Sequence, residues 1–451
     1  MSTSALRALA DAGLRALETD DPALFALLEA DHVRQRDTLA MIASASLADV
    51  SVSACESSPT GNVTAEGYPG RRYHAGCAVV DEIERLAIDR ARTLFRARYA
   101  NVQPHSGTTA NQAVMTSVLR PGDTVLGMRL DAGGHLTHGS TASFSGTYFH
   151  GVGYGLDDSG LIDYEEVARL TLEHRPRMII CGASAYPRTI DFQRFRAIAD
   201  QVDAYLLADI SHIAGLVVAG LHPSPIDAAH FTTTSTYKQL YGPRGGLIVM
   251  GRDADAPAPR GDRTLSELLQ HAIFPYFQGT PRLNTIAAKA RAFAMAATPD
   301  FRELARRIAA DASALATAMS RLGWPVLTDG TDNHIVLVDV SARQLTGAIA
   351  EQAAERCGIV VNRNKIHHDK YGPRVTGGVR LGTNTLAARG MGPEQMTECA
   401  QLLDQVWSAA VATGTTTFDL DPDVRTETEQ AVLSLCKRYP LPHLLFGTAV
   451  A

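Results

Sequence analysis

Five short apolar runs, each long enough for one buried strand, constrain the fold of this 451-residue chain more than any other feature. Stretches with helical spacing or turn residues lie between them, so each run is separated from the next by a crossover. Buried strands joined by crossovers form a layered α/β domain with a mostly parallel sheet. The runs cover residues 123–128, 178–181, 204–209, 230–234 and 246–250.

The other periodic segments divide the chain into three parts. Apolar residues recur at helical spacing in the first forty residues, and residues 79–95 carry an apolar stripe opposite a charged face. Further on, two charged helical patterns alternate with two strand patterns, at residues 301–322, 334–340, 378–382 and 393–411. We therefore expect an N-terminal helical arm at 1–50, a large domain at 51–300 and a small C-terminal α/β domain at 301–451.

Charge and cysteine patterns exclude several classes of protein. The net charge of -6 comes from interspersed acids and arginines, and no basic run would follow a nucleic acid or an anionic membrane. No apolar stretch reaches the roughly 20 residues that span a bilayer. The six cysteines have no CxxC spacing, and the first ten residues lack a signal-peptide pattern. We expect a reduced, cytoplasmic protein without nucleic-acid or membrane partners and without a bound metal.

Lysine is rare in this chain, so an amine nucleophile has few candidates. Of the 42 basic residues, only Lys238, Lys289, Lys365, Lys370 and Lys437 are lysines. Arginine cannot replace them because its side chain stays protonated. Lys238 lies between a strand pattern and a glycine-rich turn, where it could join an aldehyde cofactor if its surroundings deprotonate the amine. A solvated surface lysine is the alternative.

Two other segments carry groups that suit such a cofactor. At residues 103–111, small residues and the hydroxyls of Ser106 and Thr108 begin a helical pattern, where they could hold a phosphate or simply cap the helix. Asp209 ends an apolar strand, where an acid can pair with a protonated pyridine nitrogen or can cap a helix. With Lys238, the order phosphate loop, acid, lysine favours a single cofactor site.

At these residues the chain resembles the serine hydroxymethyltransferase family, and the resemblance extends from about residue 42 to residue 440. A match of this length is more specific than any single motif. It implies the α/β fold of the aspartate aminotransferase-like, fold type I enzymes of pyridoxal phosphate, with a large domain and a smaller C-terminal domain. The matching segments are residues 66–73, 101–107, 133–139, those around Asp209 and Lys238, and 378–383.

The resemblance implies a role for each residue of a cofactor site. Lys238 would hold pyridoxal phosphate covalently, Asp209 would pair with its ring nitrogen, and His135 would stack on the ring. Arg380 would bind the substrate carboxylate with help from Ser44, because its planar fork matches a carboxylate. The phosphate would be held by Ser106, Gly107, Thr108 and Ser235, with Gln278 and Gly279 of a neighbouring subunit, and the ring hydroxyl side by Ser184 and His212.

The resemblance also implies tetrahydrofolate as co-substrate. Glu66 would be the acid-base residue, with Tyr73 beside the aminobenzoyl ring and Leu130, Leu136 and Asn364 around the pterin. Core packing explains the two leucines equally well. Because the family's site is shared across a dimer, we expect a homodimer or homotetramer.

The chain departs from the family at Thr64, where a tyrosine usually stands two residues before Glu66. The smaller side chain opens volume beside the substrate, as an extra methyl group at the α-carbon would require. Threonine here is similar to the α-methylserine hydroxymethyltransferase branch, which interconverts α-methylserine and alanine with folate; this cleavage needs no α-hydrogen. Drift at a tolerant position is the alternative. Other departures are Ser44-Ala45-Ser46, His74, Tyr237 and Thr280.

Three kinds of activity remain open from the sequence. The leading hypothesis is a folate-dependent hydroxymethyltransferase acting on α-methylserine, with serine as the next donor. The second is a folate-independent α-methylserine or threonine-type aldolase, or a transaldolase, that uses formaldehyde or another aldehyde. The third is a catalytically dead relative that serves as a binding subunit, which the presence of Lys238, Asp209 and Arg380 disfavours.

Overall fold

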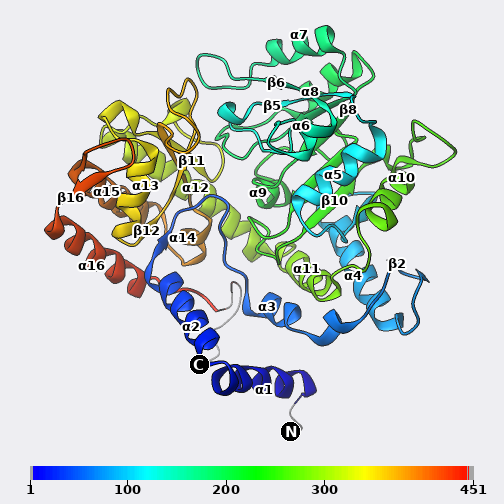
Figure 1. Ribbon diagram of the computed structural model, residues 1–451, viewed down its shortest axis with the longest axis horizontal. Coiled ribbons are helices and arrows are strands. Elements are labelled where there is room, and N and C mark those ends of the chain that lie inside the picture. Colours follow the sequence, from blue (N-terminus) through cyan, green and yellow to red (C-terminus); the bar gives the residue numbers. More distant parts are fainter. Residues whose placement is uncertain (1–3, 444, 446–451) are drawn as a thin grey trace.

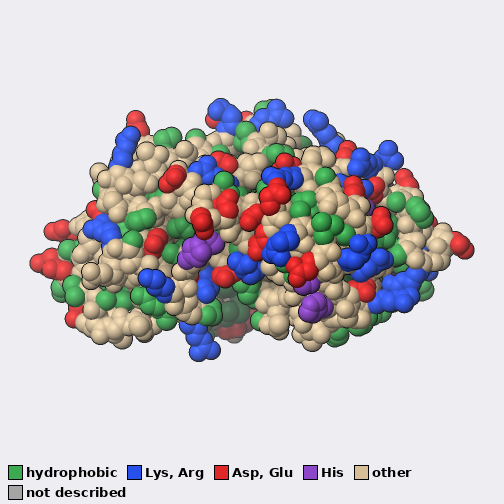
Figure 2. Space-filling view, turned by 90° about the horizontal axis from the view of Figure 1, so that it is seen from above, with side chains coloured by type: hydrophobic (Ala, Val, Ile, Leu, Met, Phe, Trp, Pro, Cys, Tyr) green, Lys and Arg blue, Asp and Glu red, His purple; other side chains and the backbone are tan. Residues whose placement is uncertain are grey.

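The computed structural model describes residues 4–443 and 445 and contains a large lobe, a small lobe and an N-terminal helical arm (Figure 1). Helix α12 (Pro299–Arg321) belongs to both lobes: Phe301 packs in the core of the large lobe, and Leu315 packs in the core of the small one. Among the described residues, no helix has the length and hydropathy of a membrane span. On the face shown in Figure 2, acidic and basic side chains are interspersed.

The large lobe is built on a seven-stranded sheet in the order β4-β10-β9-β8-β7-β5-β6. Strand β10 runs antiparallel to both of its neighbours and all other pairs are parallel, so the predicted mostly parallel α/β sheet is confirmed. The prediction missed β4, which is short, and β6, in which Gly151 and Gly153 weaken the strand pattern. The strands are β4 (Tyr99–Asn101), β5 (Thr124–Met128), β6 (His150–Tyr154), β7 (Met178–Cys181), β8 (Tyr205–Asp209), β9 (Phe231–Ser235) and β10 (Gly246–Met250).

Helices cover both faces of this sheet, because successive side chains along a strand point to opposite faces. In β8, Leu206 packs into the core that includes residues of α4, α7, α8 and α11, whereas Leu207 packs into the core formed with α5 and α10. Burial on both faces explains why the strands read as continuous apolar runs. The helices are α4 (Ala78–Phe95), α5 (Gly107–Val118), α7 (Tyr164–His174), α8 (Phe192–Asp200), α9 (Ala214–Ala219), α10 (Leu265–His271) and α11 (Leu283–Ala296).

The small lobe has an antiparallel sheet in the order β11-β14-β13, and α13, α15 and α16 contribute to its core. The chain that follows the N-terminal helices joins this lobe: β1 (Leu39–Ala40) pairs in parallel with β12 (Ile359–Val360), and Met41 lies in the same core. The arm consists of α1 (Ala5–Asp20) and α2 (Pro22–Asp37), and the other elements of the lobe are β11 (Ile335–Asp339), α13 (Gly347–Arg356), β13 (Asn362–Asn364), β14 (Gly378–Gly382), α14 (Asn384–Ala388), α15 (Pro393–Ala409) and α16 (Pro422–Arg438).

Short elements complete the described chain. They are α3 (Val50–Glu56), β2 (Gly67–Tyr68), β3 (Arg71–Arg72), α6 (Phe144–Tyr148), β15 (Ala410–Ala412), β16 (Phe418–Leu420), one π-helical turn at Ala272–Phe277 and 3-10 turns at Pro59–Asn62, Leu130–Ala132, Arg252–Asp255, Leu327–Asp329 and Ser341–Arg343.

Candidate active site

A cavity opens where the parallel strands of the large lobe end, which is the usual ligand position in an open α/β sheet. The loops after β4, β5, β7, β8 and β9 each contribute to it. Every residue predicted to bind the cofactor lines this cavity except Gln278 and Gly279. The lining residues are Ser106, Gly107, Thr108, His135, His138, Ala183, Ser184, Asp209, Ser211, His212, Ser235, Tyr237 and Lys238.

One end of the cavity is formed by the N-terminus of α5. The Ser106 hydroxyl caps the helix by accepting a hydrogen bond from the Thr109 N–H at 3.0 Å. A side chain at Gly107 would place its Cβ 2.7 Å from the Ser235 hydroxyl, so glycine keeps this corner open. Hydroxyls and free N–H groups at a helix N-terminus suit a phosphate. Sequence reasoning missed Ser211, whose hydroxyl lies 3.3 Å from that of Ser235.

Asp209 also lines the cavity and is held by three partners. Its carboxylate accepts hydrogen bonds from Asn111 Nδ2 (2.8 Å) and the Ser211 N–H (3.0 Å), and it lies 3.2 Å from His138 Nε2. Burial by itself raises the pKa of Asp209, but the histidines and these hydrogen bonds hold that pKa well below its ordinary value. Asp209 therefore stays an anion that can pair with a protonated ring nitrogen. The prediction missed Asn111 and His138, although both lie in or beside matching segments.

Lys238 lines the same cavity and is almost fully buried. Burial lowers its pKa to about 8; Asp209 opposes the shift and Arg380 adds to it. Burial likewise lowers the pKa of His135 to about 4, so its imidazole is neutral and can stack on an aromatic ring. The Nδ1 atom of His212 is buried and has no hydrogen-bond partner in the described part of the chain. These lining groups match a pyridine aldehyde that carries a phosphate group and a hydroxyl group on its ring.

Arg380, on β14 of the small lobe, lies beside the cavity and contacts one of its lining residues. Its guanidinium donates to the Ser184 carbonyl (2.5 Å) and to Asn362 Oδ1 (3.1 Å). Burial lowers its pKa to about 10, which still leaves it charged at neutral pH. The segment that contains Ser44 passes the end of the same strand, since a Cβ at Gly382 would lie 2.3 Å from the Cα of the residue before Ser44. These two predicted carboxylate-binding residues thus come from adjacent segments.

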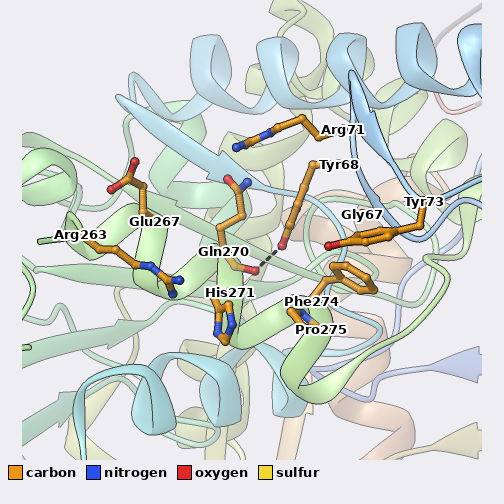
Figure 3. Close-up of a pocket in the computed structure, with 10 residues that line it drawn as sticks. All are labelled: Gly67, Tyr68, Arg71, Tyr73, Arg263, Glu267, Gln270, His271, Phe274 and Pro275. Atoms are coloured by element: carbon orange, nitrogen blue, oxygen red, sulfur yellow. Dashed lines mark hydrogen bonds between the residues drawn. The ribbon is translucent and has the colours of Figure 1, made fainter. Parts of the chain in front are cut away.

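The residues predicted to bind folate, and Thr64, which was predicted to lie beside the α-carbon of the substrate, do not line this cavity within one chain. Tyr73 is 76% exposed and lies against Phe274, with ring centroids 5.6 Å apart, in a separate cleft (Figure 3). Glu66 Oε1 lies 3.1 Å from the Cβ position of Gly279, and Thr64 is exposed nearby in sequence. This single chain therefore gathers Glu66, Tyr73 and Gly279 around a surface apart from Lys238.

The other predicted positions are divided between loops. The Gln278 side chain accepts from the His105 N–H (3.0 Å) and donates to the Gln103 carbonyl (2.9 Å), so it fixes the phosphate loop of its own chain. Leu130 lines a cavity next to His135, Leu136 is 47% exposed, and the Asn364 amide donates to the Lys365 carbonyl.

Three side chains of the site also group as metal ligands do. Donor atoms of His135, His138 and Asp209 lie within 4.8 Å of one another. The same carboxylate already has three polar partners, and His135 Nδ1 lies 2.8 Å from the Thr137 hydroxyl. We assign this cluster to the ring of an organic cofactor.

The family of the chain follows from comparison with known families. The family model for serine hydroxymethyltransferase matches residues 17–403, which is most of the chain. The chain belongs to the serine hydroxymethyltransferase family. It is a pyridoxal-phosphate-dependent hydroxymethyltransferase with the α/β architecture of fold type I. The match begins within α1, so most of that helix precedes it.

The family's cofactor fits the residues of the cavity. Pyridoxal phosphate, when bound, supplies an electron sink for the bonds at the amino acid's α-carbon. Ser106, Gly107 and Ser235 would receive its phosphate and Asp209 would keep its ring nitrogen protonated. Lys238 would offer the amine, and the family's second substrate is tetrahydrofolate.

Proposed function

We propose that this serine hydroxymethyltransferase relative interconverts α-methylserine and alanine, with tetrahydrofolate and 5,10-methylenetetrahydrofolate as one-carbon partners. The observation that carries the proposal is Thr64, where the family usually has tyrosine. A side chain of this size leaves room for a methyl group on the α-carbon. Arg380 would hold the amino-acid carboxylate, and Glu66 would hold and move the proton of the hydroxymethyl oxygen.

One assay tests the donor directly. The purified enzyme is given α-methylserine or L-serine with and without tetrahydrofolate in the cleavage direction, and D-alanine, L-alanine or glycine with either 5,10-methylenetetrahydrofolate or formaldehyde in the synthesis direction. We expect folate-dependent turnover that is fastest with α-methylserine and one alanine enantiomer. Faster turnover of serine than of α-methylserine would reject the assignment, and equal rates without folate would favour an aldolase.

Serine and glycine are the second candidate pair. The match to the serine hydroxymethyltransferase model over most of the chain supports this pair, because the family is named after serine as the hydroxymethyl donor. The cofactor residues Lys238, Asp209 and Arg380 serve both donors equally, so only groups near the α-carbon distinguish them.

We also propose that a second copy of the chain completes each active site. Glu66, Tyr73 and Gly279 lie together on a surface apart from Lys238, which supports a site shared between two subunits. Mixing Lys238→Ala enzyme with Glu66→Gln enzyme should then restore activity, because a mixed dimer contains one site with both native groups. If subunits exchange and activity stays absent, each site lies within a single chain.

The compartment proposed for the enzyme is the cytoplasm. All six cysteines are free thiols, and five of them are buried, which supports a reducing environment.

A further inference from the structure

Lys289 is a buried lysine to which the proposed catalytic and binding roles assign no function. Its side chain lies in α11 and is 1% exposed. The Nζ atom donates to three backbone carbonyls, those of Val102 (2.6 Å), Pro104 (3.1 Å) and Gly246 (2.8 Å). An ammonium has three N–H donors, so this set of acceptors matches its protonated form.

The three carbonyls belong to the segments that support the phosphate end of the cavity. Val102 and Pro104 lie in the loop that connects β4 with Ser106 at the start of α5. Gly246 begins β10, and its N–H donates to the Pro104 carbonyl at 2.9 Å. Because a Cβ at Gly246 would lie 2.2 Å from the Ser106 carbonyl, the strand and the loop are in direct contact. The ammonium therefore joins the loop to the sheet.

The surroundings are shaped to accept this side chain. A Cβ at Gly245 would lie 2.5 Å from Lys289 Cε and 2.9 Å from Nζ, so only glycine leaves space for it. Burial lowers the pKa of Lys289 to about 7, and the nearby Glu84 opposes that shift while Arg282 adds to it. The Glu84 carboxylate also accepts a hydrogen bond from Gln103 Nε2 at 2.8 Å, in the same loop.

The phosphate end of the cavity has donors but little positive charge. Its described lining there consists of Ser106, Gly107, Thr108, Ser211 and Ser235, with no arginine in the whole lining. The only lysine of that lining is Lys238, which would hold the cofactor's aldehyde. A dianionic phosphate is favoured when a buried cation lies behind the backbone that binds it.

We propose that Lys289 is a positioning residue for the cofactor phosphate: its Nζ atom holds the loop before α5 in its binding geometry and, in its protonated form, supplies positive charge from behind that loop. Every candidate donor shares the cofactor, so the outcome is independent of which amino acid the enzyme uses.

The test compares pyridoxal phosphate with pyridoxal, which lacks the phosphate, as ligands of the full-length enzyme stripped of cofactor. Lys289→Met keeps an unbranched apolar side chain that extends to Cε but removes the ammonium group and its hydrogen bonds. We expect its affinity for pyridoxal phosphate to fall roughly ten- to a hundredfold, the usual effect of losing hydrogen bonds to a charged group. Affinity for pyridoxal should change little.

Arg389→Met provides the matched control. Arg389 is another buried cation whose guanidinium donates to backbone carbonyls, namely those of Tyr439, Gln35, Arg36 and Thr38, away from the cavity. Its loss should lower the melting temperature with and without cofactor by similar amounts and leave the ratio of the two affinities unchanged.

Gly245→Ala is the second variant if the Lys289→Met protein does not fold. The added Cβ displaces the ammonium while the charge remains in the chain. We expect it to weaken pyridoxal phosphate binding more than pyridoxal binding. Equal loss of both affinities in the folded variant, or a lower melting temperature with unchanged affinities, would show that Lys289 only stabilises the fold and would overturn the proposal.

Discussion

The rate at which cofactor-free enzyme captures pyridoxal phosphate should follow the deprotonation of Lys238. Only the neutral amine attacks an aldehyde. Burial lowers the pKa of this lysine to about 8, with Arg380 contributing in the same direction. An ordinary lysine with a pKa near 10.4 has about one amine in 2,500 neutral at pH 7, whereas a pKa of about 8 gives about one in eleven. The fold thus increases the reactive fraction roughly 200-fold.

The rate of cofactor capture is predicted to rise with pH. Because the neutral form reacts, the capture rate should rise about tenfold per pH unit well below pH 8 and level off above it. Arg380→Met removes a neighbouring cation that disfavours the ammonium, so the pKa of Lys238 should rise and the bend in the profile should move to higher pH. Lys370→Met alters an exposed lysine and should leave the profile unchanged.

Stopped-flow absorbance of cofactor-free enzyme mixed with pyridoxal phosphate, from pH 6 to pH 10, measures this profile. Lys238→Ala should abolish the absorbance of the captured cofactor. A bend near pH 10 in the native enzyme would refute the inference that burial activates this amine. A bend that moves to lower pH in Arg380→Met would refute the electrostatic contribution of that residue.

Three other substitutions test separate parts of the site. Glu66→Gln keeps the shape but removes the proton carrier, so folate-dependent transfer should fall roughly 10²- to 10⁴-fold while absorbance titration finds cofactor binding intact; an unchanged rate would favour an aldolase. Thr64→Tyr should refill the space assigned to the α-methyl group at about 1 to 3 kcal/mol, a roughly 5- to 150-fold loss of kcat/KM for α-methylserine, with little loss for serine. Equal losses would remove the support for α-methylserine. Gly107→Ala places a Cβ 2.7 Å from the Ser235 hydroxyl, so equilibrium dialysis should find weaker pyridoxal phosphate binding; unchanged affinity would place the phosphate elsewhere.

Local patterns predicted most of the large lobe. The apolar runs gave five strands of the central sheet, and the stripe at residues 79–95 gave α4, which spans Ala78–Phe95. These predictions were right because a strand buried on both faces and an amphipathic helix each produce a recognisable pattern in consecutive residues. The antiparallel direction of β10 could not be predicted from the sequence, because an antiparallel strand inside an α/β sheet has the same apolar composition as its parallel neighbours.

The sequence by itself predicted which residues carry the chemistry, namely Lys238 after its strand, Asp209 at a strand end and the hydroxyls at the start of α5, and it determined the family that the chain belongs to. Only the tertiary structure decided how those groups behave. In the sequence, Lys289 resembles an ordinary helical lysine. In the folded structure, the packing of α11 places it against three carbonyls that are far away in sequence. Burial and pKa depend on atoms brought together by packing, and no local pattern records which distant segments remove a side chain from water.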